Sequence, residues 1–83
     1  MSLLNDHTES EQFTYSRSWS EIEEMLDKAE RVKNKHQIKL EEQKERGNKK
    51  KAMHHAKNMK SLEGVIKTLR WTLGDRSIGH PLE

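Results

Sequence analysis

The chain contains no cysteine, one proline, four glycines and few aromatic residues, and it has no long apolar run. Without cysteine there is no disulfide, no thiolate nucleophile and no cysteine-ligated zinc. No segment approaches the roughly 18 consecutive apolar residues that a membrane-spanning helix needs, and the N-terminal sequence lacks the basic and apolar regions of a signal peptide. We therefore expect a cytoplasmic protein without a membrane partner.

Apolar residues make up 30% of the chain and recur every three or four positions on both sides of Gly47 and Asn48. The stripe before this pair consists of Ile22, Leu26, Ala29, Val32, His36, Leu40 and Gln43. The stripe after it consists of Ala52, Ala56, Met59, Leu62, Ile66, Leu69 and Leu73. This spacing is typical of one face of an α-helix. Because the stripes are mirror images, residues whose numbers add to about 95 should face each other in an antiparallel hairpin.

The predicted domain organisation follows from these stripes. An N-terminal tail over residues 1–17 is polar and without period, so we expect it to be disordered or loosely docked. The hairpin covers residues 18–74, with helices predicted over 18–46 and 49–73 and a turn at 47–48. A short C-terminal tail over 75–83 ends in Leu82 and Glu83, which resemble residues contributed by a cloning vector.

The predicted ends of the helices carry capping residues. Two overlapping capping boxes, Ser18 with Glu21 and Ser20 with Glu23, stand where the first helix begins. Gly47 tolerates the left-handed backbone that often ends a helix. Gly74 has the same character after the second helix and is a candidate for its C-terminal cap.

A single helix that continues through Gly47 is the alternative architecture, because a glycine inside a helix costs only about 1 kcal/mol. Such a helix would pair with a second copy as a long coiled coil. The position of Gly47 and Asn48 at the mirror centre favours the hairpin. A two-helix hairpin has a thin core, so we also expect a homodimer in which two hairpins form a four-helix bundle.

An uncharged strip on the second helix is the first candidate functional feature. It consists of Gly64, Val65, Thr68, Trp71 and Thr72. Tryptophan contributes much binding energy when it is desolvated, so the strip predicts self-association or docking on an unidentified protein, with Trp19 close by. Alternatively, Trp71 covers the open end of the hairpin by packing against Trp19, Phe13 or Ile78.

A lysine-rich tip is the second candidate feature. Its basic residues are Lys44, Arg46, Lys49, Lys50, Lys51, Lys57 and Lys60, with Glu45 as the one acid between them. Such a tip attracts phosphate backbones, because each neutralised phosphate releases counterions. The tip has no aromatic residue for base stacking, so we expect any binding of DNA or RNA to be independent of sequence. The simpler interpretation is a helix end kept soluble by lysine.

The remaining residue types indicate no catalysis. There is no Gly-rich phosphate loop and no Ser-His-Asp arrangement, so we predict no catalytic residue, cofactor or small-molecule substrate. His36 lies on the first stripe and His55 lies one heptad before Leu62 of the second, so the two could approach each other. No third ligand accompanies them, and we therefore predict no metal site.

The end of the second helix, LEGVIKTLRWTLG over residues 62–74, loosely resembles the final helix of small uncharacterised proteins from bacteriophages and bacterial genomes. The resemblance names no activity and carries over no catalytic or binding residue. We expect a small accessory or regulatory protein of phage type. Together, the sequence predicts a non-enzymatic protein-interaction module. Nucleic-acid binding by the lysine-rich tip is the alternative.

Overall fold

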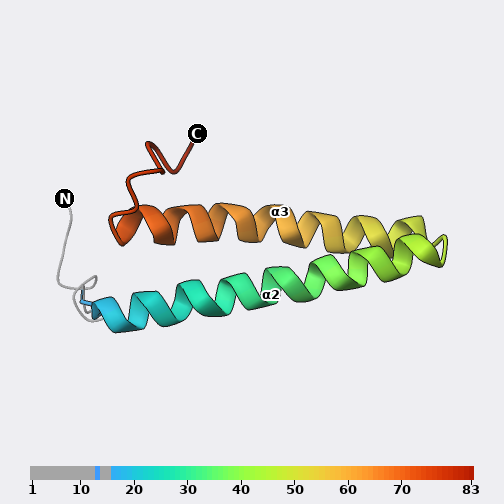
Figure 1. The fold of residues 1–83 in the computed structure, drawn as a ribbon, viewed down its shortest axis with the longest axis horizontal. Coiled ribbons are helices and arrows are strands. Elements are labelled where there is room, and N and C mark those ends of the chain that lie inside the picture. The colour runs from blue at the N-terminus through green and yellow to red at the C-terminus, as the bar shows by residue number, and fades with distance from the viewer. Residues whose placement is uncertain (1–12, 14–15) are drawn as a thin grey trace.

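The fold is taken from a computed structural model that describes Phe13 and residues 16–83. Nearly all of the predicted N-terminal tail lies outside these residues. Two helices, α2 (Trp19–Glu45) and α3 (Lys49–Thr72), pack side by side and run in opposite directions (Figure 1). The predicted all-α antiparallel hairpin is therefore confirmed, and the part of the chain that is described contains no strand.

Helix α2 begins with the first of the two possible capping boxes. The hydroxyl of Ser18 accepts a hydrogen bond from the Glu21 backbone N–H at 3.1 Å, and the Glu21 carboxylate accepts one from the Ser18 backbone N–H at 2.8 Å. This pairing satisfies two backbone donors that have no partner within the helix. The hydrogen bond from the Ser18 backbone N–H, and then the proximity of the Ser18 hydroxyl, favour the ionised carboxylate and lower the pKa of Glu21.

The turn between the helices depends on Gly47 and Asn48. Gly47 has a φ of +74°, and its N–H donates to the carbonyl of Lys44 at 3.0 Å. The N–H of Asn48 donates to the carbonyl of Gln43 at 2.9 Å, which completes a Schellman motif at the end of α2. The Asn48 side chain then caps α3 by accepting from the Lys51 N–H at 3.1 Å.

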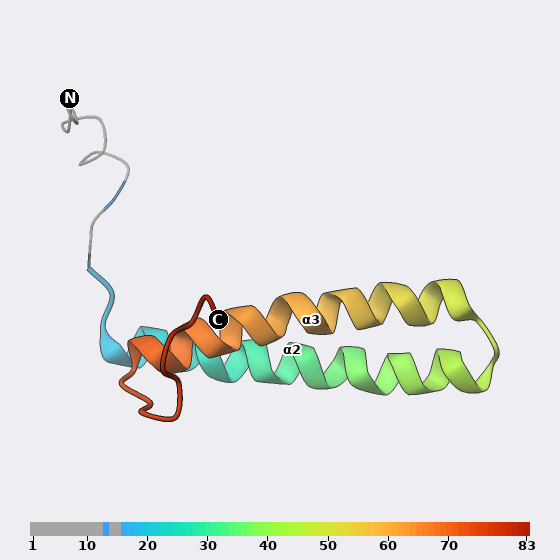
Figure 2. The same ribbon diagram turned by 90° about the horizontal axis from the view of Figure 1, so that it is seen from above.

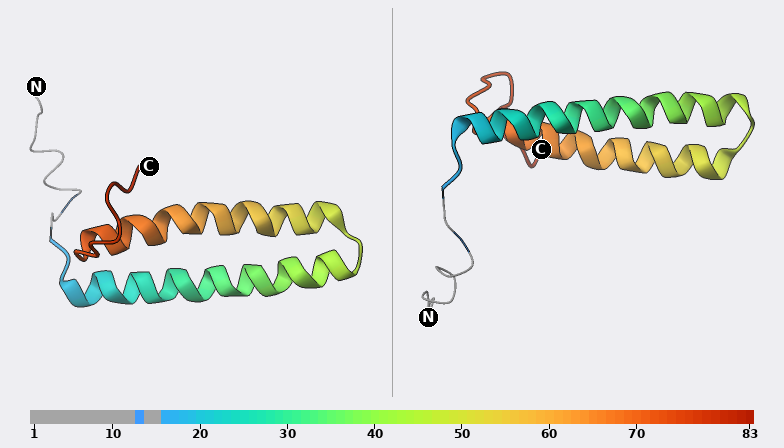
Figure 3. Two further views of the ribbon diagram at one scale, coloured as in Figure 1. Left: turned by 45° about the horizontal axis from the view of Figure 1, so that its top comes forward. Right: turned by 90° about the horizontal axis from the view of Figure 1, so that it is seen from below.

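Helix α3 ends in the same way at Gly74, as predicted. Gly74 has a φ of +90° and donates to the carbonyl of Trp71, while Asp75 donates to the carbonyl of Arg70 at 2.9 Å. The C-terminal tail then turns back and crosses over α3 (Figures 2 and 3). Both glycines thus end a helix where a side chain would strain the backbone.

The core is thin. Every residue of the two predicted stripes is buried or half-buried, which confirms the faces by which the helices pack. Among the described residues, only Ala29 and Ala52 are buried, at 6% and 7% exposure. These small residues allow close approach of the helices, but each removes little apolar area from water. A hairpin of this kind leaves much of its apolar surface half exposed.

Replacing Gly47 by alanine separates the hairpin from a single long helix. In the hairpin, the positive φ of Gly47 strains alanine, so the free energy of unfolding should fall by about 1–2 kcal/mol. In an unbroken helix, the same change would raise it by about 1 kcal/mol. Urea unfolding followed by far-UV circular dichroism measures the difference.

The control for this experiment is Gly64→Ala. Gly64 lies inside α3, and an added Cβ there meets no neighbouring atom within 4 Å. We expect a gain of about 1 kcal/mol at this position. Stabilisation by both substitutions would contradict the hairpin.

Candidate functional site

The two long edges of the hairpin differ in character. On one edge, which we call the charged edge, Arg70 pairs with Glu30 and the Lys33 Nζ lies 3.6 Å from the Glu63 Oε2. Glu30 and Lys33 lie on one side of the α2 stripe, and Glu63 and Arg70 on the facing side of the α3 stripe. Both pairs are partly exposed and each contributes about 0–1 kcal/mol, so they affect the alignment of the helices more than their stability.

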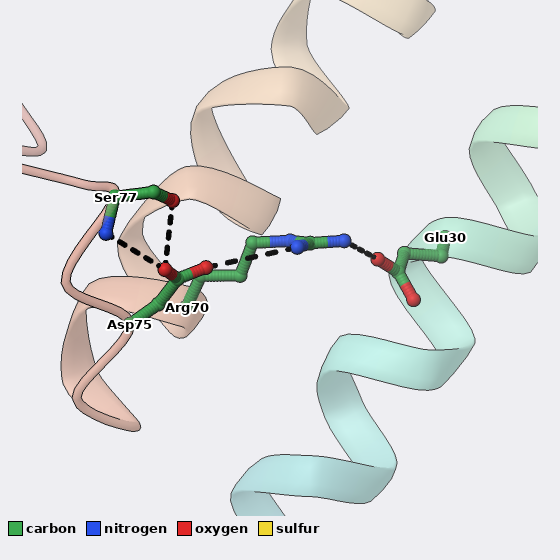
Figure 4. A network of polar contacts seen from close by, with 4 residues as sticks. All are labelled: Glu30, Arg70, Asp75 and Ser77. Atoms are coloured by element: carbon green, nitrogen blue, oxygen red, sulfur yellow. Dashed lines mark hydrogen bonds and ion pairs between the residues drawn. The ribbon is translucent and has the colours of Figure 1, made fainter.

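Arg70 also ties the C-terminal tail to the helices (Figure 4). Its guanidinium contacts Glu30 on α2 and lies 3.7 Å from the carboxylate of Asp75. The Asp75 carboxylate accepts hydrogen bonds from the hydroxyl and the N–H of Ser77, at 2.7 and 2.9 Å. The pKa of Asp75 is lowered by these two hydrogen bonds and by the nearby charge of Arg70. The bond from the Ser77 hydroxyl has the largest effect. The sequence carried no signal for this link between Arg70 and the tail.

The opposite edge, which we call the apolar edge, has a different lining. A groove of about 500 Å³ here is lined by Ile22 and Met25 from α2 and by Leu69 from α3. Charged side chains, including Glu24 and Lys28, stand around it. Met25 is 53% exposed. The sequence analysis missed Met25, although it lies three residues after Ile22 and seven before Val32, a spacing that marks the edge of a helical stripe.

The predicted uncharged strip continues from the apolar edge around the outer face of α3. Val65, Trp71 and Trp19 are 45%, 50% and 66% exposed, and Gly64 and Thr68 are also exposed. The Thr68 hydroxyl donates to the carbonyl of Gly64 at 2.9 Å. In the same way, the Thr72 hydroxyl donates to the carbonyl of Thr68. Since both hydroxyl protons are used within the helix, the strip offers few hydrogen-bond donors to a partner.

The structure brings part of the strip together with the C-terminal tail. Gly64, Val65 and Thr68 line a shallow groove of about 520 Å³ whose other side is formed by Pro81 and Leu82. The two tryptophans named in the sequence analysis do not line this groove. The sequence carried no signal for this contact, because the tail has no period that would place it on a helix face.

The lysine-rich tip lies at the other end of the molecule, around the turn. All seven of its basic residues are exposed, and within the described part of the chain none of them forms an ion pair. Lys44 and Lys49 stand beside a groove of about 450 Å³ lined by Leu40, Ala52 and Met53. The positive charge of the tip is therefore available to an anionic partner.

His36 and His55 meet across the helices, as predicted. Their Nδ1 atoms are 2.9 Å apart, and both residues are half-buried. Burial, and then the positive charges of His36, His54 and Lys39, lower the pKa of His55, whereas Glu42 opposes the shift. Within the described residues, no third histidine, aspartate or glutamate completes a three-ligand metal cluster around them.

No protein-family model, curated protein or solved structure matches this chain. In the described residues, neither helix combines the length and the apolar character needed to cross a lipid bilayer.

The lowered pKa of His55 makes stability depend on pH. As the pH falls below about 6.5, the unfolded chain binds a proton at His55 before the hairpin does, so the free energy of unfolding falls. The loss is complete below the lowered pKa of the folded state. We expect His55→Gln to reduce the difference between urea midpoints at pH 7.5 and 5.5. His80→Gln, in the exposed tail, is the control. An undiminished difference in His55→Gln would contradict this assignment.

Proposed function

We propose that this protein is a non-enzymatic interaction module that self-associates as a dimer of hairpins and binds a protein partner as a small accessory or regulatory factor. The observation that supports the proposal is the uneven burial of its apolar residues. Only Ala29 and Ala52 are buried among the described residues, while Met25, Val65 and Trp71 keep about half of their surface exposed.

The thin core gives a thermodynamic reason for association. Full burial of a leucine, isoleucine or methionine side chain contributes about 1.5–3 kcal/mol, and half-buried stripe residues gain only part of that. Ordering the backbone costs about 1–2 kcal/mol per residue. A second hairpin that covers the exposed part of the stripes would remove the rest of this apolar surface from water. Small helical domains commonly reach stability in this way.

The distribution of charge favours one docking side. Covering the charged edge would take the Glu30–Arg70 and Lys33–Glu63 pairs out of water, and desolvation of such pairs is costly. Covering the apolar edge would bury Met25 and Leu69 and leave Glu24 and Lys28 at the rim. A four-helix bundle formed through the apolar edges of two copies therefore buries more apolar surface than one formed through the charged edges. It also removes fewer charged groups from water. The adjacent uncharged strip would extend this interface at Val65, and its other exposed residues would receive the partner.

A charged residue on the strip tests the self-association. We expect Val65→Lys to reduce the mass in light scattering from twice the 9.8 kDa of one chain to that of the monomer, because a lysine there must be desolvated. Ile38→Lys is the matched control, since Ile38 is 59% exposed and lies opposite the stripe on α2. A mass that is unchanged in Val65→Lys, or monomeric wild-type protein at about 100 μM, would refute the dimer.

The lysine-rich tip favours a second candidate function, the sequence-independent binding of DNA or RNA. It is supported by seven exposed basic residues without ion-pair partners in the described chain. The absence of an aromatic residue from the tip sequence favours contacts to phosphates over contacts to bases. Under this proposal, α2 and α3 serve to hold the charges on a rigid end.

A gel-shift titration tests this second candidate. If about four phosphates are neutralised, affinity should fall roughly a hundredfold between ~50 and ~200 mM salt. Replacing Lys49, Lys50 and Lys51 by glutamate should abolish the shift. The charge-matched control places glutamate at Lys28, Lys35 and Arg76, away from the tip, and should bind more strongly than the tip variant. No shift at low salt, or equal losses in both variants, would refute binding by the tip.

A further inference from the structure

The histidine pair is a chemical feature that neither proposed function uses. His36 and His55 are 19 residues apart in the chain, yet their Nδ1 atoms lie 2.9 Å from each other and their ring centroids 5.2 Å apart. In the neutral pair, one Nδ1 carries the hydrogen and the other accepts it. The nitrogens that share this hydrogen bond are also two potential metal ligands, one from each helix.

We infer that His36 and His55 form a two-histidine site for a divalent transition-metal ion of the zinc, nickel or copper class. The ion would replace the hydrogen bond between the two Nδ1 atoms and join α2 to α3. The Nδ1 that carries the hydrogen would release this proton to water, and the Nε2 of the same ring would take one up, so that both rings bind the ion as neutral imidazoles. The inference is independent of self-association, because both ligands come from one chain.

The separation of the nitrogens fits this chemistry. Imidazole nitrogens bind zinc at 2.0–2.1 Å, so two of them at right angles on one ion are about 2.9 Å apart, and at the tetrahedral angle about 3.3 Å apart. The observed 2.9 Å lies at the first value and within about 0.4 Å of the second. The rings must then rotate so that both lone pairs point at one ion beside the line that joins the two nitrogens, while the nitrogens keep nearly the same separation.

The surroundings also suit a metal ligand pair. Both residues occupy stripe positions, so helix packing holds their backbones in place before the ion arrives. Burial favours the neutral imidazole of His55, which is the form that binds metal. The neighbouring His54 ring is 3.3 Å from the Asn58 amide nitrogen, on the outside of α3. It therefore serves as an internal control.

Two nearby charges and the ligand count limit the affinity. Lys39 repels a cation at this position, whereas Glu42 attracts it. With two protein ligands in the described chain, water must complete the coordination shell, and binding should be far weaker than at a four-ligand structural zinc site. Imidazole ligands suit zinc, copper and nickel, and copper should bind most tightly of the three.

Metal-dependent stability tests the site. The two nitrogens are held together only in the folded hairpin, so a metal that binds there stabilises the fold. We expect zinc or nickel chloride, added to the full chain without a polyhistidine tag at pH 7.5, to raise the thermal midpoint in circular dichroism. Above the dissociation constant, each tenfold increase in free metal should multiply the folding constant about tenfold, and EDTA should reverse the effect.

Single substitutions identify the ligands. His36→Gln and His55→Gln should each abolish the metal-induced shift, whereas His54→Gln and His80→Gln should retain it. No shift in the wild-type protein at about 1 mM metal would overturn the proposal. An equal shift in His36→Gln would do the same.

A second measurement covers the case in which a histidine variant fails to fold. Long-range ¹H–¹⁵N spectra of the wild-type protein should show zinc-dependent changes at the Nδ1 atoms of His36 and His55. Changes confined to His54 or to the histidines of the tails would overturn the assignment.

Discussion

The reversal of the chain at Gly47 is the constraint on which the rest of this structure depends. A residue with positive φ ends α2, and the side chain of the next residue, Asn48, accepts from the Lys51 N–H in the first turn of α3. Only this reversal brings together residues that are 19 to 40 positions apart, such as the His36–His55 and Glu30–Arg70 pairs. Without it, the same stripes would require a second chain.

The small number of helices determines where the surfaces lie. Two helices cover each other along one line, so most stripe residues stay half-buried and each edge of the hairpin faces water. At the charged edge, charged side chains of α2 and α3 form ion pairs with each other. At the apolar edge, no corresponding contact within the described chain covers the exposed side chain of Met25. This difference supports the proposal of a partner on that side.

The three features discussed above are separate along the molecule. The lysine-rich tip surrounds the turn, the histidine pair lies in the polar half next to it, and the apolar edge with the uncharged strip lies toward the open end. A metal ion at His36 and His55 would hold the helices together near the tip, where small and polar residues such as Ala52 and Gln43 provide little apolar burial.

The sequence by itself determined the helices, their facing stripes and their ends, because periodicity, capping and left-handed glycine are properties of neighbouring residues. Its mirror symmetry also predicted that His36 would approach His55. Only the tertiary structure decided that Lys33 pairs with Glu63, that Met25 lines the apolar edge and that Pro81 returns to α3. Those contacts depend on the rotation of each helix about its axis and on side-chain rotamers. The rule that facing residues have numbers adding to about 95 leaves the rotation and the rotamers undetermined. It specifies only which residues lie at the same level along the axis of the hairpin.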